Sequence, residues 1–73
     1  MINIKADSRK VKPGDIFVAL RGISSDGHEY IDKAISLGAS KLVVMDEGDY
    51  SIPYEVVEDT REYLNNYLKE NYN

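Results

Sequence analysis

The chain has 73 residues, of which 42% are hydrophobic, and it contains one histidine and no cysteine. A domain of this size buries only roughly 60% of its unfolded surface, and without cysteine neither a disulfide nor a thiolate-bound metal can support it. The net charge of −4 disfavours a nucleic-acid partner, and no apolar run is long enough for a signal peptide or a membrane span. We therefore expect one small cytoplasmic domain held together by its apolar core, with no nucleic-acid or membrane partner.

The charge is unevenly distributed along the chain. Residues 1–21 carry five basic and two acidic side chains, which gives +3, whereas residues 22–73 carry four basic and eleven acidic ones, which gives −7. An anionic small molecule would therefore prefer the first third of the chain. The alternative is that this third forms a solvated basic edge without a ligand.

The predicted elements begin with two strands. A short strand is expected over residues 3–6, and a second over residues 16–20, where every position is apolar, as in a strand covered on both faces. Pro13 and Gly14 mark the turn before the second strand, and Gly14 is suited to a positive φ angle there.

A helix and a third strand are expected next. Asp26 is placed to cap the helix, with Glu29 at the spacing of a capping box. The apolar stripe of this helix consists of Tyr30, Ile31, Ala34, Ile35 and Leu37. Gly38 ends the helix, and a strand over residues 42–45 follows, so that the segment forms a right-handed βαβ unit.

The last third predicts one more strand and one more helix. The strand covers residues 54–58, and Asp59 with Glu62 begins a helix whose apolar face holds Tyr63, Leu64, Tyr67 and Leu68. Most of the six tyrosines thus fall on apolar stripes, where core packing is expected. Together these elements predict an α/β fold, a small three-layer α/β/α sandwich with a mixed sheet.

Two segments could bind an anion. The loop with Gly22, Ser24 and Ser25 leads from a strand into a helix, where free N–H groups favour phosphate, although capping serines are an equal alternative. The second segment is Asp7-Ser8-Arg9, in which Ser8 offers a hydroxyl and Arg9 a forked donor suited to phosphate. The alternative there is that Asp7 caps a turn and Arg9 extends into solvent.

Nothing in the sequence predicts catalysis by this chain alone. It has no nucleophile–base pair, no metal-binding cluster and no G-x-x-x-x-G-K-[ST] sequence for ATP, and His28 is expected to pack or to form hydrogen bonds.

A long ordered run of residues links the chain to a known family. The run reads D-S-R-K-V-K-P-G-D-I-F-V-A-L-R-G over residues 7–22 and D-G-H over residues 26–28, and the Gly38-Ala39 helix end and Val43-Val44 extend it. This pattern resembles the N-terminal domain shared by the Mur ligases MurE and MurF, over almost the whole chain. Asp59-Thr60-Arg61 resembles MurE more than MurF, and residues 71–73 loosely resemble the segment that closes the domain.

The resemblance implies a docking role. Mur ligases of the MurE type add the third amino acid to UDP-MurNAc-L-Ala-D-Glu in peptidoglycan synthesis, and their N-terminal domain holds the UDP end of that substrate. By this resemblance Ser8 contacts the nucleotide, Ala6 contributes a backbone contact, and the loop after Gly22 closes over uracil and phosphates. The loop residues are Ile23, Ser24 and Ser25.

Relative to that family, the chain starts only six residues before the D-S-R motif and lacks the ATPase and C-terminal domains. We therefore expect no cofactor in this chain, with ATP and Mg²⁺ bound by the absent central domain and the remaining ligase domains as partners. A missing edge strand would also expose a sheet edge, so we expect weak self-association. The alternative functions are a MurF-type docking domain and a stand-alone, non-catalytic interaction protein with the same fold.

Overall fold

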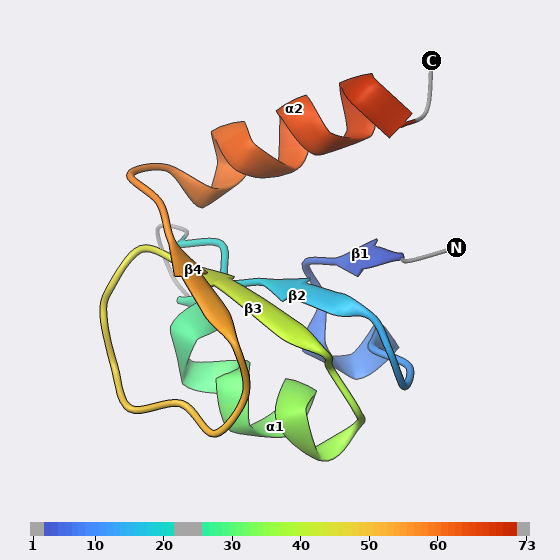
Figure 1. The fold of residues 1–73 in the computed structure, drawn as a ribbon, viewed down its shortest axis with the longest axis vertical. Helices are drawn as coiled ribbons and strands as arrows, with labels where there is room; N and C mark the ends of the chain where they lie inside the picture. Colours follow the sequence, from blue (N-terminus) through green and yellow to red (C-terminus); the bar gives the residue numbers. More distant parts are fainter. Residues whose placement is uncertain (1–2, 22–25, 72–73) are drawn as a thin grey trace.

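Residues 3–21 and 26–71 are described in the computed structural model of the chain (Figure 1). Their elements are, in chain order, β1 (Ile4–Lys5), η1 (Ser8–Lys10), β2 (Ile16–Val18), η2 (Gly27–Tyr30), α1 (Ile31–Ser36), β3 (Lys41–Val44), β4 (Tyr54–Val56) and α2 (Thr60–Asn71), where η denotes a 3₁₀ helix. All four expected strands and both expected helices are present, so the predicted α/β class is confirmed.

The four strands form one sheet in the order β1-β2-β3-β4, and each neighbouring pair is parallel. The prediction of a mixed sheet is therefore wrong for the described residues. Every connection returns the chain to the same end of the sheet before the next strand begins. The strands lie in the sheet in the same order as in the sequence. Connections of the same handedness between such strands all pass over the same face of the sheet.

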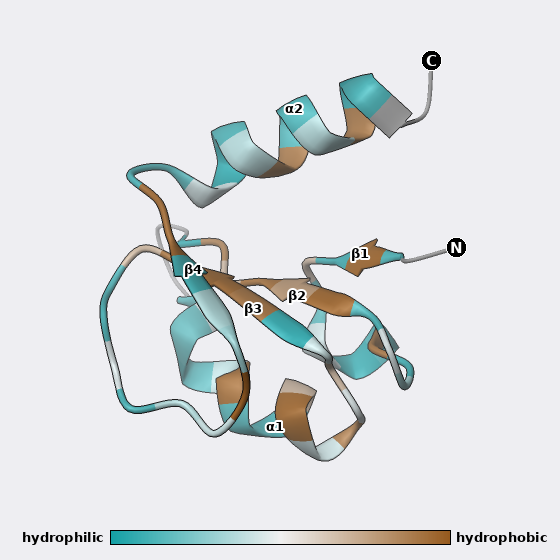
Figure 2. Ribbon diagram, viewed as in Figure 1, coloured by the Kyte–Doolittle hydropathy of each residue, from teal (hydrophilic) through white to brown (hydrophobic). Residues whose placement is uncertain are grey.

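Alternating side chains of the two central strands build a separate apolar cluster on each face. Phe17 and Leu42 belong to the cluster on the α1 face, together with Val11 from the first crossover and Ile52 from the third. Val18 and Val43 belong to the cluster on the opposite face, against which Tyr63 and Leu64 of α2 pack. The sheet thus lies between α1 and α2, which confirms the three layers (Figure 2).

Local signals in the sequence correctly marked the ends of elements. Gly14 has φ +91° in the turn before β2, and Gly38 has φ +102° after α1. The carboxylate of Asp26 accepts a hydrogen bond from the His28 N–H, and that of Asp59 accepts from two N–H groups at the start of α2. Both aspartates therefore cap a helix start as predicted, Asp26 at η2 rather than at α1, whereas within the described residues neither Glu29 nor Glu62 makes the return bond of a capping box.

Residues 27–30 differ from the prediction, because they form a 3₁₀ helix rather than the first turn of an α-helix. A 3₁₀ helix has three residues per turn, which changes the direction of each side chain relative to an α-helical stripe. Tyr30 is consequently 46% exposed instead of buried in the core. Tyr54, on the edge strand β4, is also 40% exposed, although its ring packs edge to face against the ring of Tyr50.

Both β1 and β4 are edge strands of the described sheet. The expected pairing between chains through a sheet edge stays a prediction. Among the described residues, no helix combines the length and the apolar character needed to cross a membrane.

Candidate functional site

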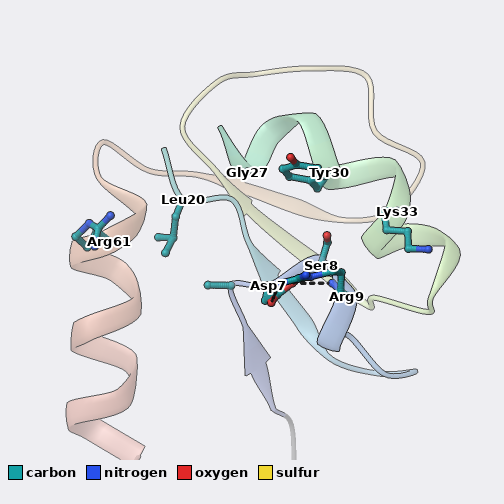
Figure 3. Close-up of a pocket in the computed structure, with 9 residues that line it drawn as sticks. Asp7, Ser8, Arg9, Leu20, Gly27, Tyr30, Lys33 and Arg61 are labelled. Carbon is teal, nitrogen blue, oxygen red and sulfur yellow. Dashed lines mark hydrogen bonds and ion pairs between the residues drawn. The ribbon is translucent and has the colours of Figure 1, made fainter. Parts of the chain in front are cut away.

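A cavity of about 760 Å³ opens beyond the carboxyl ends of β1 and β2 (Figure 3). Ala6 to Arg9 enter it directly after β1, and Leu20 enters it two residues after β2. Its lining residues are Ala6, Asp7, Ser8, Arg9, Leu20, Gly27, Tyr30, Lys33 and Arg61. In open parallel sheets, the region beyond the carboxyl ends of the strands is the usual location for ligands. The position of this cavity therefore makes it the candidate binding site.

Ser8 supplies the cavity with a hydroxyl that has no partner among the described residues. The residue is 7% exposed and is the first residue of η1. Its hydroxyl takes part in no hydrogen bond within residues 3–21 and 26–71, and no fully buried polar side-chain atom there lacks a partner. The hydroxyl therefore keeps contact with the cavity space, where it can donate a hydrogen bond to a ligand and accept one from it.

Asp7 and Arg9 form a closed pair at the rim of the cavity. Asp7 caps η1 by accepting from the Arg9 N–H at 2.9 Å, and the Arg9 guanidinium donates to both carboxylate oxygens, at 3.1 and 3.0 Å. These bonds from Arg9 lower the pKa of Asp7 from 3.8 to about 2. The Arg9 side chain is 82% exposed and is already bound to Asp7. The structure therefore agrees with the alternative in which Asp7 caps a turn and Arg9 extends into solvent.

Two further cations reach the cavity from elements far away in sequence. Lys33 comes from α1 and Arg61 from α2, on opposite sides of the view in Figure 3. Neither forms an ion pair with an acid in the part of the chain that the structure describes. Tyr30 also lines the cavity. Among the described residues, the cavity thus offers an aromatic face, the Ser8 hydroxyl and two positive charges that form no ion pair. This combination suits an anionic ligand with a planar ring.

Gly27 allows η2 to approach β2 closely enough to form one wall. Its N–H donates to the Leu20 carbonyl at 2.6 Å, and a Cβ at this position would lie 2.7 Å from the Leu20 nitrogen. The other atoms that such a Cβ would meet are also backbone atoms, which no rotation of a side chain could move away. Glycine is therefore required here for close approach of two backbone segments.

His28 and Asp26 form a pair that resembles a catalytic dyad but is fully used for structure. The His28 Nδ1 lies 2.6 Å from an Asp26 oxygen, and His28 Nε2 accepts from the Met45 N–H at 3.0 Å. Since a backbone N–H is always a donor, Nε2 is the unprotonated nitrogen and Nδ1 carries the proton. Neither ring nitrogen is free to act as a base, so the predicted hydrogen-bonding role of His28 is confirmed.

The structure brings together three of the predicted site residues, Ser8, Ala6 and Arg9. The predicted loop residues Gly22, Ile23, Ser24 and Ser25 lie outside the described residues. Five cavity residues were missed from sequence, namely Leu20, Gly27, Tyr30, Lys33 and Arg61. Three of them carried a signal, because Leu20 and Gly27 lie in the family pattern over residues 7–22 and 26–28 and Arg61 lies in the Asp59-Thr60-Arg61 motif, but no binding role had been attached to these positions.

The residues present do not fit the ATP and magnesium sites that the resemblance implies for a complete ligase. The sequence has no G-x-x-x-x-G-K-[ST] motif, and residues 3–21 and 26–71 contain no group of three His, Asp or Glu side chains arranged to hold a metal ion.

Comparison with known proteins supports the resemblance at the level of the family. A family model described as "Mur ligase family, catalytic domain" matches residues 2–72. The UDP-N-acetylmuramoyl-L-alanyl-D-glutamate--2,6-diaminopimelate ligase of Chlorobium phaeobacteroides is 43% identical over 65 residues, which cover 84% of this chain and 13% of that protein. The UDP-N-acetylmuramoyl-tripeptide--D-alanyl-D-alanine ligase of Haemophilus influenzae is 46% identical over 59 residues, 80% of this chain and 13% of that protein.

The comparison of this fold with solved structures indicates the same family. The crystal structure of the MurF ligase of Thermotoga maritima in complex with ADP matches with a TM-score of 0.82 and 31% identity, covering 93% of this chain and 16% of that one. The chain therefore spans only 13 to 16% of the length of these relatives. Since the family model covers nearly every residue and the fold agrees with that of a solved ligase, the chain belongs to the Mur ligase family.

Proposed function

We propose that this chain is a docking domain that binds the UDP end of UDP-MurNAc-L-Ala-D-Glu for a MurE-type, ATP-dependent ligase of peptidoglycan synthesis. The observation that carries the proposal is the cavity beyond β1 and β2, into which Ser8 presents a hydroxyl that no other described residue binds. The relatives named above act on UDP-N-acetylmuramoyl peptides, which combine a planar base, a sugar and a diphosphate.

The chemistry of the cavity suits each part of such a ligand. Tyr30 and Leu20 provide apolar surface for a base or a sugar, and Ser8 provides a hydrogen-bonding group that can select its orientation. Lys33 and Arg61 provide positive charge for the diphosphate. A volume of about 760 Å³ lies within the range of small-molecule sites, roughly 300–1,000 Å³. The proposed activity is binding, with catalysis left to other domains of the ligase.

A MurF-type docking domain is the second candidate. It is favoured by the solved structures, since the Thermotoga maritima MurF and two crystal structures of Acinetobacter baumannii MurF, with TM-scores of 0.80 and 0.79, all resemble this chain. The MurE type is favoured by Asp59-Thr60-Arg61 and by further diaminopimelate ligases, such as that of Clostridium tetani, 52% identical over 46 residues. Fusing the chain to the catalytic domains of a known MurE and of a known MurF, and measuring which fusion ligates its own substrate, would separate the two.

The proposal is tested by titrating the chain with UDP-MurNAc-L-Ala-D-Glu while amide chemical shifts are recorded. We expect the amides of Ser8, Leu20 and Gly27 to shift in a saturable manner. Ser8→Ala should weaken binding about 2- to 12-fold, the value of one hydrogen bond of about 0.5–1.5 kcal/mol. Ser51→Ala is the matched control, because Ser51 is exposed in the connection between β3 and β4 and does not line the cavity.

Saturable shifts confined to residues away from the cavity, or no shifts at millimolar ligand, would overturn the proposed function. If the Ser8→Ala and Ser51→Ala variants bind UDP-MurNAc-L-Ala-D-Glu with equal affinity, the Ser8 hydroxyl does not bind the ligand.

A further inference from the structure

The geometry points to Arg61, held at the cavity by the buried hydroxyl of Thr60, as the residue that binds the diphosphate of the ligand. This inference rests on the proposed function and adds a residue that lies outside the D-S-R segment and the loop after Gly22.

Among the charged side chains that line the cavity, Arg61 is available to bind an anion. Three basic side chains and one acidic side chain line it, but Arg9 and Asp7 neutralise each other through two hydrogen bonds between their side chains. The remaining lining cations are Arg61 and Lys33, which form no ion pair with any acid in residues 3–21 and 26–71. A bound anion would therefore meet positive charge that the protein has not already used.

Backbone N–H groups at two helix starts near the cavity are already occupied. At the start of α2, the Asp59 carboxylate accepts from the N–H groups of Arg61 and Glu62 at 2.9 and 3.1 Å. In the same way Asp7 accepts from the Arg9 N–H at the start of η1. Each of these helix starts also carries the negative charge of its capping aspartate, which disfavours an anion. At these two helix starts, side chains rather than backbone N–H groups are left to recognise a diphosphate.

Thr60 fixes the position from which Arg61 acts. Thr60 is 1% exposed, and its hydroxyl donates at 2.9 Å to the carbonyl of Ala19, which is itself fully buried. This bond joins the first residue of α2 to the end of β2, next to Leu20 in the cavity wall. Arg61 follows Thr60 directly, and its own N–H donates to the Asp59 carboxylate, so its backbone is fixed on both sides.

Arginine suits this position for a chemical reason. Its planar guanidinium can donate two parallel hydrogen bonds to phosphate oxygens, and a fixed backbone reduces the conformational entropy lost on binding. Lys33 acts as a point charge without that fork geometry. Arg61 should therefore respond to the phosphates of the ligand, whereas the nucleoside should be held by the opposite part of the cavity.

The test compares uridine, UMP and UDP as probes, titrated by calorimetry or amide shifts against the chain and four variants. Arg61→Gln should weaken UDP binding about 10- to 100-fold while changing uridine binding less than twofold, because only hydrogen bonds to the charged phosphates are lost. Lys69→Gln is the matched control, since Lys69 is an exposed cation on the same helix that does not line the cavity. It should bind all three probes as the unchanged chain does.

Thr60→Val and Thr60→Ser test the positioning role. Valine has nearly the same shape but removes the bond to Ala19, so UDP affinity should fall and uridine affinity should remain, whereas serine keeps the hydroxyl and should restore UDP affinity. The salt dependence of UDP binding should decrease in Arg61→Gln and stay unchanged in Lys69→Gln.

The outcomes separate the inference from the function on which it rests. If UDP binds the Arg61→Gln variant as tightly as the unchanged chain, or if that variant loses uridine equally, the inference is overturned and the docking function stands. Equal affinity of the unchanged chain for uridine and UDP also overturns the inference alone. If neither uridine nor UDP binds at millimolar concentration, the proposed function is overturned together with the inference.

Discussion

Replacing Gly27 with alanine should destabilise the fold through a clash between two backbone segments. The added Cβ would lie 2.7 Å from the Leu20 nitrogen, 2.8 Å from the Leu20 oxygen and 3.0 Å from the Ala19 Cα. All three are backbone atoms at the end of β2, so relief requires η2 and β2 to move apart. That movement would also weaken the hydrogen bond from the Gly27 N–H to the Leu20 carbonyl, which is 2.6 Å long.

The cost can be estimated from these two effects. Overpacking costs about 1–3 kcal/mol, and one hydrogen bond contributes about 0.5–1.5 kcal/mol, so Gly27→Ala should cost roughly 2–4 kcal/mol. A chain of 73 residues has a total stability of roughly 4–11 kcal/mol, which makes this a large loss. Urea unfolding followed by circular dichroism should show a clearly lower midpoint with an unchanged slope.

Gly48→Ala is the matched control for this prediction. A Cβ there would meet the Tyr50 ring at a similar distance, 2.8 Å, but the ring is the end of a side chain that can rotate away. We expect a loss below about 1 kcal/mol, in the range of ordinary surface substitutions. A Gly27→Ala variant as stable as Gly48→Ala would refute the argument that backbone contact with β2 requires glycine at position 27.

Three further predictions concern the core and the charged groups. Phe17→Ala, at a position 1% exposed, should cost about 3–5 kcal/mol and leave a substantial fraction of the chain unfolded by circular dichroism; a fully cooperative transition near the original midpoint would contradict it. Asp15→Asn should cost about 1–3 kcal/mol in urea unfolding at pH 7, because the buried carboxylate accepts from the Lys5 ammonium at 3.0 Å and the Lys12 N–H at 2.9 Å. For Asp26, hydrogen bonds from the His28 N–H and ring and from Arg21 lower the pKa from 3.8 to about 2, so its contribution to stability is present above pH 3.8 and lost as the pH falls towards 2. Urea midpoints measured from pH 6 to pH 2 should therefore decrease more steeply in the unchanged chain than in Asp26→Asn, and parallel curves would rule this out.

Much of the local structure was predictable because its causes lie within a few residues of one another. Gly14 and Gly38 have the positive φ angles that their turns require, and Asp26 and Asp59 cap the helices that follow them. The continuous apolar run that contains β2 predicted burial on both faces, and the structure has an apolar cluster on each side of it. Ser8 could be singled out because it lies shortly after the first strand, at the end of a sheet where ligands commonly bind.

The tertiary structure alone decided which distant residues share the cavity. The βαβ unit predicted the parallel pair of β2 and β3 correctly, but the expected mixed sheet was wrong, because a hydrophobic pattern carries little information on the direction of strands that no such unit joins. Tyr30 was assigned to the core because an α-helical period was applied to residues that form a 3₁₀ helix. Arg61 reaches the cavity only because α2 packs across the sheet through Tyr63 and Leu64 and because Thr60 bonds to Ala19. Local propensity and capping thus determined the elements of this protein, whereas packing between elements far apart in the sequence determined the charge and shape of its candidate site.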